Sequence, residues 1–203
     1  MIAIINYKLG NLGSVFNMVK KAGGIPIITC DHQEILKAQK IILPGVGHFD
    51  AGMKAIYESG LKEILYRKAV EEKTPLLGIC LGMQLLTEGS EEGNLPGLGW
   101  IQGYAKRFSF PESLNLKVPQ MGWNTVRVSH PCPLTQDFDQ EYRFYFVHSY
   151  CVTVNSQENS MLKTMHGIEF DSGIQKENIY GVQFHPEKSH RFGLKLLKNF
   201  IHL

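Results

Sequence analysis

A single cysteine stands between two glycines in the segment Gly78-Ile79-Cys80-Leu81-Gly82, after an apolar run and before a helical pattern. This spacing is typical of a nucleophile elbow, a sharp strand-to-helix turn that projects a reactive side chain. A helix N-terminus beside the sulfur favours the thiolate, and the Leu81 amide then points toward an oxyanion formed on a substrate carbonyl. The pattern predicts a nucleophile. The alternative is that Cys80 is a small buried apolar residue, as many cysteines are.

A base for that thiolate is predicted at His185, in the segment Gly181-Val182-Gln183-Phe184-His185-Pro186-Glu187. Glu187 lies two residues further on, and a turn that Pro186 partly fixes brings the carboxylate back to the imidazole. Nucleophile, base and orienting group then follow the order Cys, His, Glu. Alone, a His-x-Glu sequence is also typical of a surface turn. Combined with the elbow at Cys80, it predicts a catalytic triad.

Other motifs lack parts that their chemistry needs. Cys30, Cys132 and Cys151 stand far apart without a Cys-x-x-Cys pair, so neither a disulfide framework nor a four-thiolate zinc site is predicted. The glycines at 97–103 are misplaced by one position for a dinucleotide fingerprint, and the segment 10–13 lacks the Lys-Ser/Thr of a phosphate loop. We therefore expect no metal and no cofactor.

Composition limits the remaining classes. The 203 residues are 43% hydrophobic, with 21 Lys and Arg against 19 Asp and Glu. This balance favours a globular protein and gives no reason to expect a nucleic-acid or membrane partner. The first residues lack a basic lead and a long apolar run, so we expect no signal peptide and a cytoplasmic protein. Without a linker or repeat, one domain over residues 1–203 is expected.

The periodicity predicts an α/β fold. Short apolar strands alternate with amphipathic helices in the first half, which indicates a mostly parallel sheet with helices on its faces. The later strands follow one another without full helices and predict antiparallel or mixed pairing at one edge. The expected strands are 2–6, 25–30, 40–43, 75–79, 106–108, 123–128 and 143–147, and the expected helices are 11–22, 52–72, 83–87 and 189–203.

The segments Gly78–Gln84 and His185–Glu187 together resemble the class I (triad) glutamine amidotransferases. Further segments resemble, within that class, the glutaminase subunits of imidazole glycerol phosphate synthases, and the resemblance covers almost the whole chain. These segments are 44–47, 119–124, 146–150 and 185–189. The resemblance implies a flavodoxin-like fold with a central, mostly parallel sheet.

The resemblance also implies a reaction. The Cys80 thiolate attacks the side-chain amide of glutamine, His185 protonates the departing ammonia and then activates water, and Glu187 orients the imidazole. Family positions that bind the oxyanion or hold glutamine match Gly45, Val46, Gly47, Leu81, Gln84, His148, Ser149 and Tyr150. By the residues alone, Gln84 is an ordinary helix-surface residue, and Ser149 and Tyr150 form the end of a strand.

A partner follows from the same resemblance. Glutaminases of this family form a heterodimer with a (β/α)8 cyclase, which uses the ammonia to make imidazole glycerol phosphate and the purine precursor AICAR in histidine biosynthesis. Family positions near that contact match Asn11, Trp123, Tyr145 and Lys188, although both aromatic residues suit a core equally well. A rotation of the Gly45–Val46 peptide, which the flanking glycines make inexpensive, is a hypothesis for how the partner controls activity.

Departures from the family pattern concern the partner. His166–Phe170 and Asp171–Ile174 are atypical, and the segment 189–193 is similar to paralogues that supply ammonia for amidination of a surface-polysaccharide sugar. That paralogous activity is the main alternative. A redox or chaperone-like protein with an elbow cysteine is another, and it would not need His185 and Glu187 together.

Overall fold

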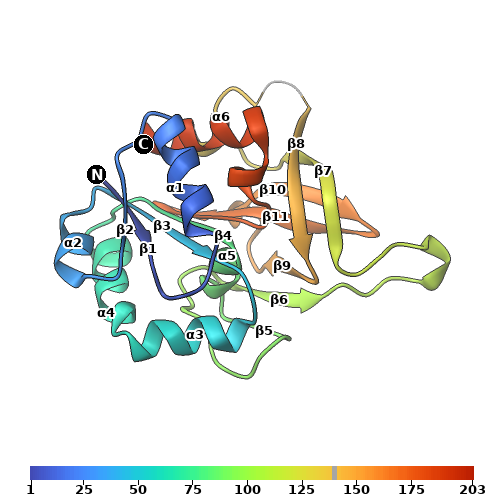
Figure 1. The fold of residues 1–203 in the computed structure, drawn as a ribbon. Helices are drawn as coiled ribbons and strands as arrows, with labels where there is room; N and C mark the ends of the chain where they lie inside the picture. Colours follow the sequence, from blue (N-terminus) through green and yellow to red (C-terminus); the bar gives the residue numbers. More distant parts are fainter. Residues whose placement is uncertain (139–140) are drawn as a thin grey trace.

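The computed structural model describes residues 1–138 and 141–203. Its centre is a parallel sheet, formed where the sequence has short apolar runs. The neighbouring strands are, in spatial order, β2 (Pro26–Thr29), β1 (Ile2–Ile5), β3 (Lys40–Gly45), β4 (Leu76–Cys80) and β12 (Ile179–Val182). Figure 1 shows these strands in the middle of the molecule. The predicted parallel core of an α/β fold is therefore confirmed.

Antiparallel strands continue the sheet beyond β12, as the sequence predicts for one edge. In spatial order they are β11 (Ile168–Lys176), β10 (Ser160–His166), β7 (Gln120–Val128) and β8 (Tyr142–His148). β9 (Tyr150–Val154) pairs with β11 and with β6 (Gly103–Arg107), which pairs with β5 (Gly89–Ser90). The loop between β6 and β7, with the short helix η2 (Glu112–Leu114), extends from the body (Figure 1).

Helices cover both faces of the parallel strands (Figure 1). α1 (Leu12–Lys21) and α6 (His190–Ile201) pack on one face, and their buried residues share a core with Ile4 and Ile42. The helices of the opposite face are α2 (His32–Lys37), α3 (Phe49–Glu58), α4 (Leu61–Tyr66), the π-helix η1 (Arg67–Glu71) and α5 (Leu81–Leu85). Further short helices are η3 (Pro133–Thr135), η4 (Gln157–Asn159) and η5 (Pro186–Lys188).

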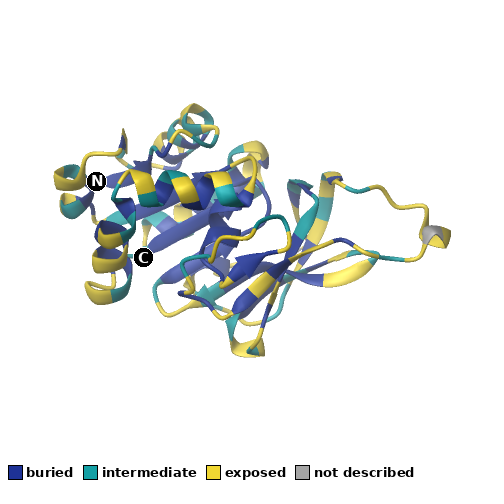
Figure 2. Cartoon of the chain, turned by 90° about the horizontal axis from the view of Figure 1, so that it is seen from below, coloured by how far each residue is buried: buried dark blue, intermediate teal, exposed yellow. Residues whose placement is uncertain are grey.

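The strands divide their side chains between the two cores because successive residues of a strand point to opposite faces. In β1, Ile2 and Ile4 join the core under α1 and α6, whereas Ala3 and Ile5 join the core under the other helices. In Figure 2 the buried strands run between helices whose outer faces are exposed. This two-sided burial explains why the strands are continuous apolar runs rather than alternating ones.

The helix expected over 52–72 is wrong as a single element. Gly60 has φ +65°, in the left-handed region, and the chain there leaves α3 and begins α4. The expected helix over 83–87 starts two residues earlier, at Leu81, directly after Cys80. The short helix α2 was not expected; Asp31 caps it by accepting a hydrogen bond from the Glu34 amide at 2.9 Å.

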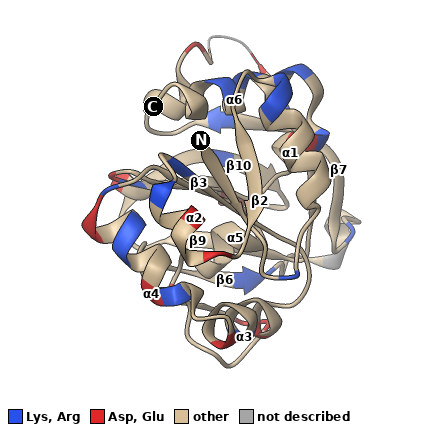
Figure 3. Ribbon diagram, turned by 60° about the vertical axis from the view of Figure 1, so that its left-hand side comes forward, with Lys and Arg blue, Asp and Glu red and all other residues tan. Residues whose placement is uncertain are grey.

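Charged residues lie on helices, strands and loops alike (Figure 3). Those of α1 and α6 are all basic: Lys20 and Lys21 on α1, and Arg191, Lys195 and Lys198 on α6. Within the described ranges, no helix is both long and apolar enough to cross a membrane.

Candidate active site

Cys80 is the last residue of β4, and α5 begins at the next residue. Its φ of 55° and ψ of −112° are unusual for a residue with a side chain and cost about 1–3 kcal/mol. The elbow is tight because a Cβ on Gly82 would overlap the carbonyl oxygen of Leu43 in the neighbouring strand. The two glycines are therefore needed for space, as the motif predicts, and the turn aims the thiol at the carboxyl end of the sheet.

His185 reaches the same end of the sheet from β12, three residues beyond its last residue. Its backbone amide donates a hydrogen bond to the Tyr145 carbonyl at 2.9 Å. The Ser189 hydroxyl donates to the His185 carbonyl at 2.6 Å and accepts from the Tyr145 amide at 3.0 Å. Ser189 is fully buried, so these bonds hold the His185 backbone against β8 with little freedom.

The imidazole of His185 is paired with Glu187 through the turn that the sequence predicts. Nδ1 donates to Oε1 at 2.8 Å, and each side chain is only 2% exposed. Burial by itself lowers the pKa of His185, but contacts with Cys80 and Glu187 outweigh it and raise the pKa to about 10. The site thus favours a protonated imidazole between the sulfur and the carboxylate.

A cavity of about 240 Å³ opens beside the sulfur and the imidazole. Its size suits a small ligand such as an amino acid rather than a nucleotide. The residues that line it are Val46, Gly47, Cys80, Leu81, Gln84, Glu92, Val147, His148, Ser149, Tyr150 and His185. Nine of these were singled out from the sequence. Gly45 and Glu187 stand just behind the wall, in contact with residues that line it.

His148 is a neutral wall residue rather than a second base. Burial lowers the pKa of its imidazole to about 3, and the hydrogen bond to the Tyr150 carbonyl offsets only part of that effect. Nδ1 donates to this carbonyl at 2.7 Å, and Nε2 lies 3.0 Å from Gln120 Oε1. Because the neutral ring has its only proton on Nδ1, Nε2 accepts, and the Gln120 amide must turn its NH2 group toward it. With both ring nitrogens in use, His148 fixes the turn from β8 to β9 that carries Ser149.

The Gly45–Gly47 loop crosses the top of the elbow. Gly45 pairs in register with Cys80, and a Cβ there would collide with the Tyr7 hydroxyl and approach the Gly82 amide to 3.0 Å. Gly47 has φ +108°, which favours glycine, and no atom of the described residues lies within 4 Å of the position that a Cβ would take. Burial, together with the negative charge of Cys80, raises the pKa of the Tyr7 phenol, so Tyr7 stays neutral beneath the loop.

Glu92 is a wall residue that the sequence analysis missed. Its Oε2 accepts a hydrogen bond from the Phe49 amide at 2.9 Å, at the start of α3. Asp50 in turn accepts from the amides of Asn94 and Leu95, each at 3.0 Å. These reciprocal bonds tie the segment that follows the 45–47 loop to the segment 92–95, and they bring a carboxylate to the cavity. No sequence motif announces this placement, which depends on a contact across 43 residues.

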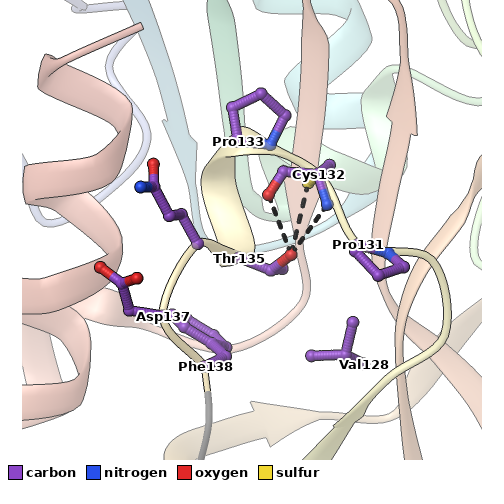
Figure 4. A pocket seen from close by; sticks show the side chains of 8 residues that line it. Val128, Pro131, Cys132, Pro133, Thr135, Asp137 and Phe138 are labelled. Carbon is purple, nitrogen blue, oxygen red and sulfur yellow. Dashed lines mark hydrogen bonds between the residues drawn. The ribbon is translucent and has the colours of Figure 1, made fainter.

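A larger hollow, about 690 Å³, lies elsewhere, around Cys132 and Phe138 (Figure 4). The Thr135 hydroxyl donates to the Cys132 sulfur at 3.7 Å, and the described residues that line the hollow include no histidine. A thiol without a base is a poor nucleophile, so size alone does not make this hollow the site of chemistry.

Comparison with known proteins decides between the classes that this geometry allows. The sequence model of the family described as "Glutamine amidotransferase class-I" matches residues 3–203. The chain belongs to the class I glutamine amidotransferases. Its curated relatives include "Imidazole glycerol phosphate synthase subunit HisH 2" of Methanococcus maripaludis, 55% identical, with 99% of this chain and 98% of the relative covered. "Imidazole glycerol phosphate synthase subunit HisH 1" of Campylobacter jejuni is 47% identical, with both chains covered completely.

Solved structures of more distant proteins share the fold of this amidotransferase. The structure of PurLQS from Thermotoga maritima superimposes with a TM-score of 0.73 at 19% identity, covering 99% of this chain and 97% of that one. The structure of a putative GMP synthase protein from Thermoplasma acidophilum gives 0.70 at 18% identity, covering 99% and 92%. These likenesses confirm the expected fold class.

The residues predicted to contact a partner form one cluster in this amidotransferase, with Asn11 nearby. The Trp123 and Tyr145 rings meet edge to face, with centroids 6.3 Å apart, and the Lys188 ammonium lies 5.8 Å from the Tyr145 ring centre. Trp123 also stacks on His190 and is 41% exposed, so it is a surface residue rather than a core one. Asn11 caps α1, which packs against η5, the short helix that carries Lys188.

Proposed function

We propose that this amidotransferase is the glutaminase subunit of an imidazole glycerol phosphate synthase. It hydrolyses glutamine and passes the ammonia to a (β/α)8 cyclase subunit in the cytoplasm. One observation carries the chemistry: a thiol on a strained elbow, a buried His185–Glu187 pair and an amino-acid-sized cavity meet at the carboxyl end of the sheet. The names of the relatives, at up to 55% identity over nearly the whole chain, support the biosynthetic role.

The reaction assigns a task to each member of the triad. The Cys80 thiolate forms a C–S bond to the amide carbon of glutamine. The C–N bond then breaks as His185 gives its proton to the leaving nitrogen, which departs as ammonia. The now neutral His185 takes a proton from water, whose oxygen attacks the thioester, and glutamate leaves as the C–S bond breaks. Glu187 keeps the imidazole in its useful orientation throughout and stabilises its charged form.

The cavity wall offers groups for the rest of the substrate. The carboxylate of Glu92 lines the cavity, where it could pair with the α-ammonium group of glutamine. Gln84, Ser149 and Tyr150 line the same cavity, which supports a role for them in binding the amide and carboxylate ends of glutamine. This assignment explains selection of an amino acid with a free α-amino group, because a ligand without it would leave Glu92 with an unpaired charge.

The backbone amides of Leu81 and of the 45–47 loop would stabilise the oxyanion of the tetrahedral intermediate by hydrogen bonds. Only glycine fits at position 45, where a Cβ would collide with Tyr7, and Gly47 has a positive φ of 108°, which favours glycine. Rotation of the Gly45–Val46 peptide between these points would bring a donor to the oxyanion only when the partner is loaded. Full glutaminase activity of the isolated subunit would contradict this gating.

A partner is required because ammonia released into neutral water is protonated and is no longer a nucleophile. The exposed Trp123 with Tyr145 and Lys188 supports a docking surface, since aromatic residues are enriched at the centre of interfaces. Asn11 stands on the neighbouring helix α1. We propose that the barrel cyclase covers this surface.

A second candidate partner is the barrel paralogue that uses ammonia to amidinate a surface-polysaccharide sugar. The atypical segment His166–Phe170 forms the turn between β10 and β11, and the Asn124 amide donates to the Met165 carbonyl beside it at 2.9 Å. The turn therefore lies next to the strand that carries Trp123. A departure from the family pattern at this place alters the surface that faces the partner.

The test uses the complete chain mixed with the histidine-pathway cyclase or with the polysaccharide paralogue. Glutamate release is measured, and a glutamine-analogue diazoketone is added so that its adduct can be located by mass spectrometry. We expect alkylation at Cys80 with loss of glutaminase activity, activity only with the histidine-pathway cyclase, and none in Cys80→Ala. Cys30→Ala is the control, because Cys30 is exposed and outside the cavity. An active enzyme with unmodified Cys80 would overturn the proposal, and activation by the paralogue alone would replace the partner.

A further inference from the structure

A fully buried glutamine side chain touches the proposed nucleophile from the side of the sheet. Gln183 follows β12 directly, and its backbone amide donates to the Ser172 carbonyl at 2.9 Å, which anchors it to β11. Its Nε2 lies 3.7 Å from the Cys80 sulfur. Its Oε1 accepts a hydrogen bond from Gln84 Nε2 at 3.0 Å. Nothing in the reaction outlined above uses Gln183.

The direction of this chain of hydrogen bonds is fixed at its far end. Gln84 Nε2 also contacts the Tyr150 carbonyl at 3.3 Å, and a carbonyl can only accept. Gln84 must therefore turn its NH2 group toward Gln183, whose oxygen receives it. Only the NH2 group of Gln183 is then left for the sulfur. The same Tyr150 carbonyl accepts from His148 as well, so its acceptor sites are occupied.

An amide donor on a buried sulfur has a definite physical effect. A hydrogen bond to an ionised acceptor is about twice as strong as one between neutral groups, and low polarity strengthens it further. Gln183 is 0% exposed and Gln84 is 4% exposed, so water does not compete for the donor. The sulfur thus has an imidazole as one neighbour and a directed N–H as the other.

We propose that Gln183 is a positioning residue of the glutaminase reaction: its amide holds the Cys80 sulfur as thiolate and links it to Gln84 in the cavity wall. The inference rests on the proposed function, because it presumes that Cys80 is the nucleophile. A ligand that contacts Gln84 changes the position of its amide, and with it the hydrogen bonds from Gln84 to Gln183 and from Gln183 to the Cys80 sulfur. Gln183 therefore couples occupation of the cavity to the orientation of the sulfur.

The experiment uses two variants in the reconstituted complex with the cyclase. Gln183→Glu keeps the shape but sets a carboxylate against the sulfur, and Gln183→Met removes the donor while nearly keeping the volume. The readout is the pH profile of Cys80 alkylation by iodoacetamide, located by mass spectrometry, alongside kcat and KM for glutamine. Thermal unfolding of each variant is followed to establish that it is folded.

We expect the alkylation profile to move to higher pH in both variants, further in Gln183→Glu because like charges repel. We expect kcat to fall roughly ten- to a hundredfold in Gln183→Met, the value of one hydrogen bond to a charged group. Thr135→Val is the matched control, since it loses a buried hydroxyl that bonds the Cys132 backbone at 3.0 Å and 3.1 Å, outside the cavity beside Cys80. Its alkylation profile should equal that of the unsubstituted enzyme.

Two results would overturn the inference, and one would overturn its foundation instead. If a folded Gln183→Met variant keeps the pH profile of Cys80 alkylation and the kcat of the unsubstituted enzyme, the Gln183 amide does not stabilise the Cys80 thiolate. An equal shift in Thr135→Val would show that the loss of any buried polar contact has the same effect. If Cys80→Ala keeps its glutaminase activity, the proposed function fails and Gln183 has no nucleophile to position. Should Gln183→Glu not fold, Gln183→Met alone decides.

Discussion

Nδ1 of His185 lies 2.8 Å from Oε1 of Glu187, and both side chains are 2% exposed. The contact is local, across two residues, but its effect reaches the sulfur because the same imidazole contacts Cys80. Burial alone would leave this histidine neutral, and the carboxylate is one of the two groups that reverse the direction of its pKa shift. Glu187 therefore fixes the orientation of the imidazole and, together with Cys80, sets its charge.

Replacement of Glu187 by glutamine tests this relationship. The amide keeps the shape but removes the charge, so the pKa of His185 should fall and the ring loses its fixed orientation. We expect kcat for glutamine hydrolysis in the complex to fall roughly 10²- to 10⁴-fold, the range for orienting carboxylates in triads. Glu177→Gln, at an exposed carboxylate paired with Lys73, is the control and should change kcat less than twofold. Equal kcat in the two variants would remove Glu187 from the triad.

The pH dependence of stability should reveal His148. Its folded pKa of about 3 lies below the ordinary value of 6.5, so between these values the unfolded chain binds a proton that the folded chain does not. Stability is therefore lost as pH falls below 6.5, by up to about 1.4 kcal/mol per pH unit. His185 adds no slope below about pH 5.5, where it is protonated in both the folded and the unfolded chain; closer to pH 6.5 the unfolded residue loses its proton and His185 contributes with the opposite sign.

Urea unfolding between pH 4.5 and 6.5 measures this slope in the unsubstituted protein and in a variant without His148. The comparison cancels the slopes of His185 and of the carboxyls with lowered pKa values, Asp50, Glu72, Glu169 and Glu177, which are common to both proteins. His148→Gln keeps a side-chain donor for the Tyr150 carbonyl but has nothing to titrate. We expect its slope to be clearly smaller than that of the unsubstituted protein. Parallel curves for the two proteins would mean that His148 does not stay neutral in the folded state.

The sequence predicts the first four strands of the parallel core and the turn that pairs His185 with Glu187, and for the same reason. Strands such as 40–43 are continuous apolar runs, and Cys80, His185 and Glu187 stand in short local motifs. Fold class, and the turn that brings Glu187 to His185, follow from patterns that span a few residues. The Ser59-Gly60 pair is a local signal for the break between α3 and α4. The spacing of apolar residues on both sides, however, is that of one continuous helix, and it led to the wrong prediction.

Features that depend on distant contacts were missed. β11 carries Asp171 and Ser172, polar residues that are buried because Asp171 accepts from the Ser160 hydroxyl at 2.6 Å and from the Val154 amide at 2.9 Å. A hydrophobic period does not show such a strand. Glu92 was missed for a similar reason. Its position in the cavity depends on a hydrogen bond from the Phe49 amide, 43 residues away in the sequence, which no local motif predicts.

Gly82→Ala should disrupt the elbow. A Cβ there overlaps the Leu43 carbonyl, and neither backbone can yield without breaking the β3–β4 pairing. We expect a loss of about 2 kcal/mol or more in the free energy of unfolding, together with loss of glutaminase activity. Gly13→Ala is the opposite case, in an exposed helix position with open space, and should stabilise by about 0.4–1 kcal/mol. Urea unfolding compares the two, and equal stability would contradict the crowding argument.

Trp123→Ala tests the proposed docking surface without touching the core. The indole is 41% exposed and lies over Tyr145 and His190, so its removal should change the free energy of unfolding by less than about 1 kcal/mol. In the complex it should become buried, and aromatic anchors at interface centres are commonly worth 2 kcal/mol or more, about thirtyfold in Kd. Titration calorimetry with the cyclase measures that loss.

Ile25→Ala is the control, because Ile25 is 74% exposed just before β2, at the opposite end of the sheet from Cys80. If both substitutions leave Kd unchanged, the cyclase docks elsewhere; if only Trp123→Ala weakens binding, the partner covers the end of the sheet where ammonia is released.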